Sequence, residues 1–175
     1  MVNPKRVLVA FSSRSGSTAG TAEEIAAVLR SFGFVVDCRP KEEVTDVTLY
    51  RAVVLGSGTY VASRASDGGG FLERHARALR GRDLWLFSAG PIGGHVAADG
   101  EVSAATAVAR AVGARGVAAF GAALAHDEED PFASAVPADP REVRAWALEI
   151  AAGLGAPATP ARPRRNRCHG AVAAR

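Results

Sequence analysis

Hydroxyl-bearing side chains are concentrated in one short stretch near the start of the chain, "FSSRSGSTAG" at residues 11–20. The stretch follows an apolar run and precedes a helical pattern, so its middle falls at a helix N-terminus. Unpaired N–H groups and the helix dipole favour an anion there, hydroxyls add donors, and glycine lets the backbone close around a ligand. We therefore expect a phosphate to bind at Ser13, Arg14, Ser15, Gly16, Ser17 and Thr18.

Two common phosphate loops do not fit this stretch. The Walker loop requires G-x-x-x-x-G-K-[ST], and no lysine is present; the dinucleotide fingerprint requires G-x-G-x-x-G, whereas only Gly16 and Gly20 occur here. The phosphate is therefore expected to be held mainly by uncharged donors, through hydrogen bonds of about 1.5–3 kcal/mol each. Arg14 either assists them or is solvated.

Histidines and cysteines indicate no further chemistry. His95 follows "PIGG", where a surface residue is favoured over a proton relay, and His75 falls on a helical stripe and is expected to be structural. Cys38 and Cys168 have no C-x-x-C spacing, which disfavours a metal site or a disulfide. The sequence therefore predicts no metal site and assigns no catalytic residue.

Five segments have the pattern of strands. Apolar runs at 7–11, 52–55, 84–87 and 117–120 have the length of strands buried on both faces. Residues 34–38 alternate between apolar and polar, as expected of a strand near a sheet edge.

Helical patterns lie between these runs. Apolar residues at helical spacing predict helices that end near Gly33 and Gly113, a helix over 71–79, and a last helix capped by Asp139 and reaching Leu154. The segment "KEEVTDVTLY" predicts no more than a helical turn.

Alternation of strand and helix predicts an α/β domain with a flavodoxin-like, doubly wound parallel sheet of five strands, order 2-1-3-4-5, and helices on both faces. In that order, the loops at residues 12–18, 57–66 and 88–100 follow the carboxyl ends of neighbouring strands, where such folds bind ligands.

The end of the chain differs in composition from the rest. Residues 156–175 hold five arginines and no acidic residue, and the whole chain carries a net charge of +3, so the remainder is mildly acidic. We expect a domain at 1–155 and a basic, disordered tail at 156–175 that is solvated rather than bound to nucleic acid. No apolar run approaches the roughly 20 residues of a membrane span and no secretory signal is visible, which predicts a cytoplasmic protein without an integral membrane segment.

The serine-rich stretch also carries a resemblance to a known family. Residues 13–18 resemble the [ST]-x-[ST]-G-x-[ST] loop by which flavodoxins hold the phosphate of FMN. Over roughly residues 5–155, "RVLVAFSSRSGST", "AVVLGSGTYV", "FLERHARAL" and "DPREVRAWALEIA" are similar to segments of one flavodoxin subfamily. That subfamily contains the quinone-dependent protoporphyrinogen IX dehydrogenases and uncharacterised flavodoxin-domain relatives. The resemblance implies FMN as cofactor and an oxidoreductase that oxidises a porphyrinogen and passes electrons to a quinone.

The resemblance further implies that two loops enclose the isoalloxazine ring. The corresponding residues follow the third and fourth strands: Ser57, Gly58, Thr59 and Tyr60 on one side, and Ser88, Ala89, Gly90, Pro91, Ile92, Gly93 and Gly94 on the other. Tyr60 either stacks on the flavin or lies at its rim. Gly58 either presents its amide near flavin N5 or is an ordinary turn glycine.

Three functions stay open on these grounds: an FMN oxidoreductase, an electron carrier that docks a protein redox partner, and a degenerate domain that binds a partner without FMN. Where the membrane-linked enzymes carry a long basic and aromatic insertion, this chain has the short acidic "AHDEEDPFASAVPADP". This departure disfavours a quinone-docking surface, while peripheral membrane contact stays open. The glycines of "SRASDGGGF" keep the degenerate domain among the alternatives, and the only slightly acidic body disfavours a carrier.

Overall fold

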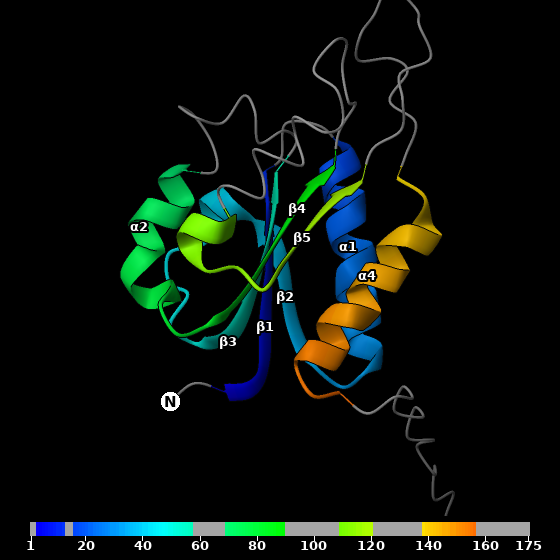
Figure 1. Cartoon of the computed structure of the whole chain (residues 1–175), viewed down its shortest axis with the longest axis horizontal. Coiled ribbons are helices and arrows are strands. Elements are labelled where there is room, and N and C mark those ends of the chain that lie inside the picture. The colour runs from blue at the N-terminus through cyan, green and yellow to red at the C-terminus, as the bar shows by residue number, and fades with distance from the viewer. Residues whose placement is uncertain (1–2, 13–15, 58–68, 90–108, 121–137, 157–175) are drawn as a thin grey trace, which may run out of the picture.

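A computed structural model describes residues 3–12, 16–57, 69–89, 109–120 and 138–156. Five strands form one parallel sheet in the order β2-β1-β3-β4-β5, which confirms the predicted topology (Figure 1). The strands are β1 (Asn3–Phe11), β2 (Val35–Pro40), β3 (Tyr50–Ser57), β4 (Asp83–Ala89) and β5 (Gly116–Phe120).

Helices cover both faces of the sheet (Figure 1). They are α1 (Gly16–Ser31), α2 (Gly69–Leu79) and α4 (Pro140–Gly153), with a 3-10 turn η1 (Lys41–Glu43). Residues 109–112 are also helical and lead into β5. The predicted turn in "KEEVTDVTLY" corresponds to η1, a segment too polar and too short to continue as a helix.

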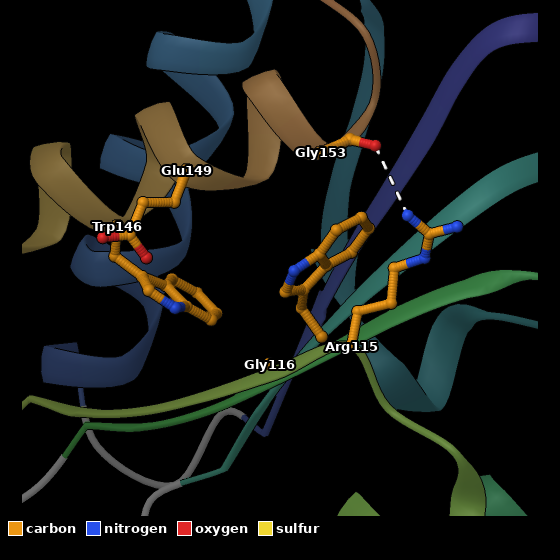
Figure 2. A pocket seen from close by; sticks show the side chains of 6 residues that line it. Arg115, Gly116, Trp146, Glu149 and Gly153 are labelled. Carbon is orange, nitrogen blue, oxygen red and sulfur yellow. Dashed lines mark hydrogen bonds between the residues drawn. The ribbon is translucent and has the colours of Figure 1, made fainter.

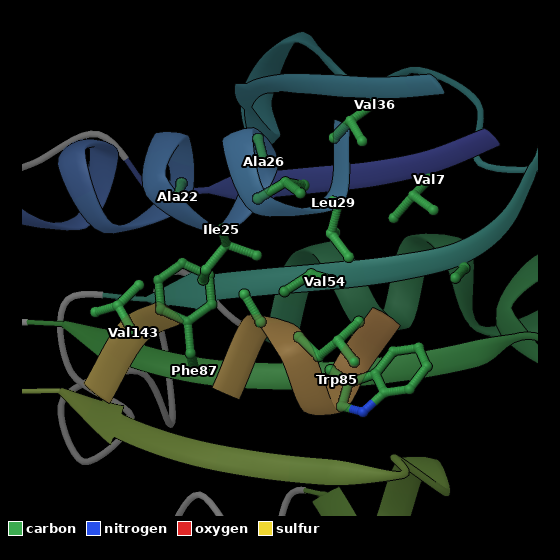
Figure 3. Packing of buried hydrophobic residues seen from close by; sticks show 14 of the residues in the cluster. Val7, Ala22, Ile25, Ala26, Leu29, Val36, Val54, Trp85, Phe87 and Val143 are labelled. Atoms are coloured by element: carbon green, nitrogen blue, oxygen red, sulfur yellow. The ribbon is translucent and has the colours of Figure 1, made fainter. Parts of the chain in front are cut away.

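The sheet separates two apolar cores because successive side chains of a strand point to opposite faces. Val7 and Val9 of β1 pack in the core beneath α1 and α4, whereas Leu8 and Ala10 pack in the core on the side of α2. Figure 3 shows the first of these cores, where side chains from α1, α4 and the sheet converge, Phe87 among them. Burial on both faces explains why the strands appear in the sequence as continuous apolar runs.

The last helix, α4, begins as its sequence predicts. The Asp139 carboxylate accepts a hydrogen bond from the Arg141 N–H at 2.8 Å, and Pro140 occupies the first turn. Val143, Ala147 and Ile150 are buried against the sheet. The cap sets where α4 begins. The apolar stripe packs the helix beside α1 on the same face of the sheet.

The described part of the chain contains no helix long and apolar enough to cross a membrane. Of the predicted tail, only Ala156 belongs to the described residues. The division into a domain and a basic tail therefore stays a prediction.

Candidate functional site

Three serines lie side by side at the carboxyl edge of the sheet, one at the end of each of its three central strands. Ser57 of β3 is in register with Ser88 of β4. Ser12 follows the register pair Phe11–Gly56, and its N–H donates to the Gly56 carbonyl at 3.0 Å. Strand alternation places all three side chains on the α2 side of the sheet. All three residues are buried.

Ser12 extends the candidate site beyond the residues predicted from the sequence. Its Oγ is buried and has no hydrogen-bond partner among the described residues. A buried hydroxyl left without a partner costs about 1–3 kcal/mol, so such an atom at the ligand-binding edge of this fold is available to a bound group. The alternation of Leu8 and Ala10, which face the α2 side of the sheet, continues to Ser12 just after β1 and was the signal that could have identified it.

The helix α1 begins at the same edge of the sheet, at Gly16, four residues after Ser12. Gly16 and Ser17 open the helix, whose first four N–H groups have no acceptor within the helix. These donors and the helix dipole make the turn suitable for an anion. The predicted phosphate site therefore begins where the structure places a helix N-terminus.

Thr18, in the first turn of α1, is hydrogen-bonded to the sheet. Its side chain is fully buried, and its hydroxyl donates to the carbonyl oxygen of Ala89, the last residue of β4, at 2.8 Å. Thr18 begins the buried stripe that continues through Ala22 and Ile25 of α1. The hydroxyl that the sequence predicts at the phosphate is thus bonded to the sheet.

The other predicted residues divide between strand ends and undescribed segments. Ser57 ends β3, and Ser88 and Ala89 end β4, so both predicted ring loops begin at the same edge of the sheet. The remaining predicted site residues lie outside the described residues: Ser13, Arg14, Ser15, Gly58, Thr59, Tyr60, Gly90, Pro91, Ile92, Gly93 and Gly94. Their part in the site stays a prediction.

His75 is buried on α2, as expected of a structural residue. Its ring lies 4.7 Å from the ring of Phe71, centre to centre. Burial lowers the pKa of His75, and the charge of Arg74 lowers it further, against weaker opposing effects of the Val44 backbone and Asp46. Its Nε2 has no partner among the described residues. The side chain is therefore kept neutral in the core.

A cavity of about 450 Å³ lies at the opposite end of the strands from the serines. Figure 2 shows the indole of Trp146 at this cavity, which Trp85 also lines. The Arg115 guanidinium lies over the Trp85 ring, 6.0 Å from its centre, and bonds Asp83 at 2.7 Å. Because Trp85 and Gly116 stand near the amino ends of β4 and β5, this cavity is separate from the predicted site.

Metal and thiol chemistry have no support in the described part of the chain. No three His, Cys, Asp or Glu side chains gather there in a way that would hold a metal ion. Burial, together with the charge and hydrogen bond of Glu23, raises the pKa of the Cys38 thiol to about 12. That thiol is protonated at neutral pH and is not a nucleophile.

Comparisons with known proteins agree with this architecture. A flavodoxin from the domain Archaea is 17% identical, with a TM-score of 0.59 over 86% of this chain and 99% of that one. A flavodoxin of Streptococcus pneumoniae TIGR4 is 19% identical, with a TM-score of 0.58 over 85% and 99%. A mutant Fusobacterium nucleatum flavodoxin bound to flavin mononucleotide is 14% identical, with a TM-score of 0.50 over 85% and 96%. A search of curated protein sequences found no match.

The structural likenesses show the fold, and the sequence itself shows the family. Residues 8–125, from β1 to beyond β5, match the family described as "Flavodoxin domain". The match includes the serine-rich stretch and the ends of the three central strands. The chain is a member of the flavodoxin-domain family.

Proposed function

We propose that the chain is an FMN-binding redox protein. The observation that carries this proposal is the arrangement at the carboxyl edge of the sheet, where Ser12, Ser57 and Ser88 stand at the ends of the three central strands and α1 begins four residues after Ser12. The unpartnered Ser12 Oγ and the N–H groups of that turn fit a ligand rich in acceptors, such as a phosphorylated flavin. Membership of the flavodoxin-domain family supports the same cofactor.

The phosphate and the ring would be held by different segments. We assign the phosphate to residues 13–18, through the serine hydroxyls and the N–H groups that open α1. We assign the ring to residues 57–60 and 88–94, which begin at the ends of β3 and β4. Bound FMN supplies the capacity to accept and release electrons, and the chain supplies binding, orientation and exclusion of water.

For the reaction, we propose oxidation of a porphyrinogen with a quinone as electron acceptor. This finer assignment is supported by the resemblance of four segments between residues 5 and 155 to the quinone-dependent protoporphyrinogen IX dehydrogenases. In such a reaction the porphyrinogen would lose hydrogens that the quinone finally takes up, and FMN held by residues 13–18, 57–60 and 88–94 would supply the redox chemistry. No described residue of this chain is assigned a proton-transfer step.

An electron carrier is the second candidate function, and one observation favours it. The structural match covers 99% of the length of two similar flavodoxins and 85–86% of this chain. This chain therefore corresponds to nearly the whole of each of those flavodoxins. A carrier would exchange electrons with a docked protein partner and would turn over no small molecule.

Cofactor identification tests the shared part of both candidates. The full chain, purified without added flavin, is denatured, and the released chromophore is identified by chromatography and mass spectrometry. We expect FMN. In apoprotein titrated with FMN, Ser12→Ala should bind more weakly than wild type, whereas Ser31→Ala, which removes an exposed hydroxyl at the far end of α1, should bind like wild type. If the wild-type protein neither contains nor binds FMN, both candidate functions are excluded. The remaining alternative is then a degenerate domain that binds a partner without FMN.

Turnover then separates the two candidates. The FMN-loaded protein is mixed anaerobically with protoporphyrinogen IX and a soluble quinone, and porphyrin fluorescence is recorded. Formation of porphyrin that depends on both quinone and FMN supports the oxidoreductase. Flavin that a reductase can reduce, with no porphyrin formed, supports the carrier.

A further inference from the structure

We infer that the cavity between α4 and β5 binds the chain's own basic C-terminal segment, residues 157–167. This cavity, called the α4–β5 cavity below, is lined by Trp85, Arg115, Gly116, Trp146, Glu149 and Gly153. It borders β5, the strand at one edge of the sheet. The inference is independent of the proposed FMN-binding function, because the cavity lies at the opposite end of the strands from the serines.

Trp146 gives the α4–β5 cavity an aromatic wall. Its ring packs edge-on against Phe87 and Phe120, with 6.2 Å and 5.6 Å between ring centres. These contacts hold the indole in place, while the residue stays partly exposed and borders the cavity (Figure 2). An indole is the aromatic side chain that attracts a cation most strongly, so this wall suits an arginine side chain.

Two glutamates flank Trp146 along α4. Glu142, Trp146 and Glu149 follow one another at spacings of four and three residues, so they share one face of the helix. Both glutamates are exposed, and within the described part of the chain neither has an ion pair or a side-chain hydrogen bond. The face of α4 at the cavity therefore carries two negative charges that are free to meet a cation.

Arg115, at the other wall of the cavity, does not cancel these charges. Its guanidinium is paired with the Asp83 carboxylate at 2.7 Å and lies over the Trp85 ring. The same side chain donates to the Gly153 carbonyl oxygen at 3.5 Å (Figure 2). Because its positive charge is already paired, the charge that the cavity offers to a ligand is that of the glutamates.

Residues 157–167 have the composition that such a surface would bind. They contain no acidic residue and four arginines, which are Arg162, Arg164, Arg165 and Arg167. Pro157, Pro160 and Pro163 recur every third residue, which is the repeat of a polyproline II helix. Proline-rich segments of this kind dock in aromatic-lined grooves, and their stiff backbone lowers the entropy lost on binding. The arginines between and after the prolines would then pair with the glutamates.

The segment also starts beside the cavity. Gly153, a lining residue, is the last residue of α4. Gly155 has a φ of 77°, and the Ala156 N–H donates to the Ala151 carbonyl at 2.9 Å, so the chain turns back at the end of the helix. Ala156 packs against the core cluster that contains Trp85. Residue 157 therefore follows directly from a position close to the cavity.

The chain length suffices for the segment to reach both glutamates. From Ala156 to Arg162 an extended chain spans about 20 Å, whereas α4 measures about 16 Å from Gly153 back to Glu142. Attachment gives the segment an effective concentration on the order of millimolar. Contacts that are weak individually are therefore enough to hold it in the cavity.

A spin label on Cys168 tests the docking in the full chain. Cys168 directly follows Arg167, and Cys38 is not labelled because its thiol, with a pKa of about 12, reacts slowly. The readout is the broadening of the indole N–H signals of Trp85 and Trp146, the only two tryptophans of the chain. A variant with all four arginines of residues 157–167 replaced by serine keeps the length and the attachment point. It serves as the undocked reference.

We expect both indole signals to be broadened more in wild type than in this reference. Replacing Glu142 and Glu149 together by glutamine should lower the ratio of docked to undocked segment by about two- to tenfold, because two exposed ion pairs are lost. Raising the salt concentration should reduce the broadening as well. Glu73→Gln, which neutralises an exposed glutamate of α2 on the other face of the sheet, should resemble wild type.

Three results would overturn the inference. Equal indole broadening in wild type and in the undocked reference would show that the segment is solvated. Broadening that neither the two glutamine substitutions nor salt reduces would show that the acidic face of α4 does not bind it. A mixture of isotope-labelled protein without the nitroxide and spin-labelled protein without the isotope detects binding between molecules. If that mixture showed the full broadening, the segment would occupy the cavity of a second copy instead of its own.

Discussion

The aromatic ring of Phe87 lies directly over the backbone of Gly56, its register partner across β3 and β4. A Cβ atom built on Gly56 would be 2.2 Å from Cζ of Phe87, well inside van der Waals contact. Phe87 in turn packs against the rings of Phe120 and Trp146, both 6.2 Å away between centres. The carboxyl edge of the sheet is therefore close-packed beneath the candidate site.

Replacing Gly56 with alanine is expected to destabilise the protein by about 1–3 kcal/mol, since the added methyl group must displace the Phe87 ring from a packed core. Urea unfolding of the two proteins measures the difference. Gly70→Ala is the matched control, because nothing lies within 4 Å of a Cβ at Gly70 of α2. We expect Gly70→Ala to be at least as stable as wild type. A Gly56→Ala protein of wild-type stability would contradict the packing.

The buried His75 is expected to make stability depend on pH. Its pKa is lowered in the folded protein, mainly by burial, so the unfolded chain takes up a proton that the folded chain resists. Stability is then complete above the ordinary histidine pKa of about 6.5 and decreases as the pH falls below it toward the lowered value.

The measurement compares the free energy of unfolding of wild type and His75→Leu at pH 7.5 and pH 5.5. Arg74 and Asp46 also act on His75 and are left unchanged. We expect wild type to lose stability at the lower pH and His75→Leu to lose less. Equal losses in the two proteins would show that His75 is not responsible.

Asp37 also makes stability depend on pH, but here the folded protein favours the charged form of the side chain. Burial opposes its ionisation, but hydrogen bonds from Tyr50 and Arg6 and the charge of Arg6 outweigh burial and lower the pKa of Asp37. The Tyr50 hydroxyl lies 2.7 Å from Oδ2 of Asp37. Stability from this contact is present above the ordinary carboxyl pKa and is lost as the pH falls through the lowered value.

Tyr50→Phe tests this contact with little other change, since the ring under the Arg6 guanidinium is kept. The pKa of Asp37, followed by NMR, should move up toward its ordinary value. The free energy of unfolding at neutral pH should fall by about 1–2 kcal/mol. An unchanged Asp37 pKa would show that the Tyr50 hydrogen bond does not stabilise the carboxylate.

The topology could be predicted because each element carries its own pattern. Runs such as residues 52–55 are apolar on both faces, as central parallel strands require, and the stripe of α4 has the helical period with a cap before it. Strand order then followed from the alternation of strands and helices. None of these features depends on contacts between distant side chains.

The site was less predictable because its details do depend on such contacts. A hydroxyl in a serine-rich stretch gives no sign of whether it faces a ligand or the core, and the acceptor of Thr18 lies 71 residues away. The signal available in the sequence is the helical spacing of Thr18, Ala22 and Ile25, all three of which are buried. The need for glycine at position 56 depends on where Phe87 lies, which no local pattern specifies.

Cys38 is expected to resist alkylation in the folded protein. Burial, with the charge and hydrogen bond of Glu23, raises its pKa to about 12, so very little thiolate is present at pH 8. Cys168→Ser leaves Cys38 as the sole cysteine of the chain. In this background, iodoacetamide at pH 8 should modify Cys38 slowly, and several-fold faster in denaturant, as judged by mass spectrometry. Adding Glu23→Gln removes the nearby negative charge and should raise the rate of Cys38 alkylation in the folded protein. If Cys38 reacts equally fast with and without denaturant, the fold does not protect it.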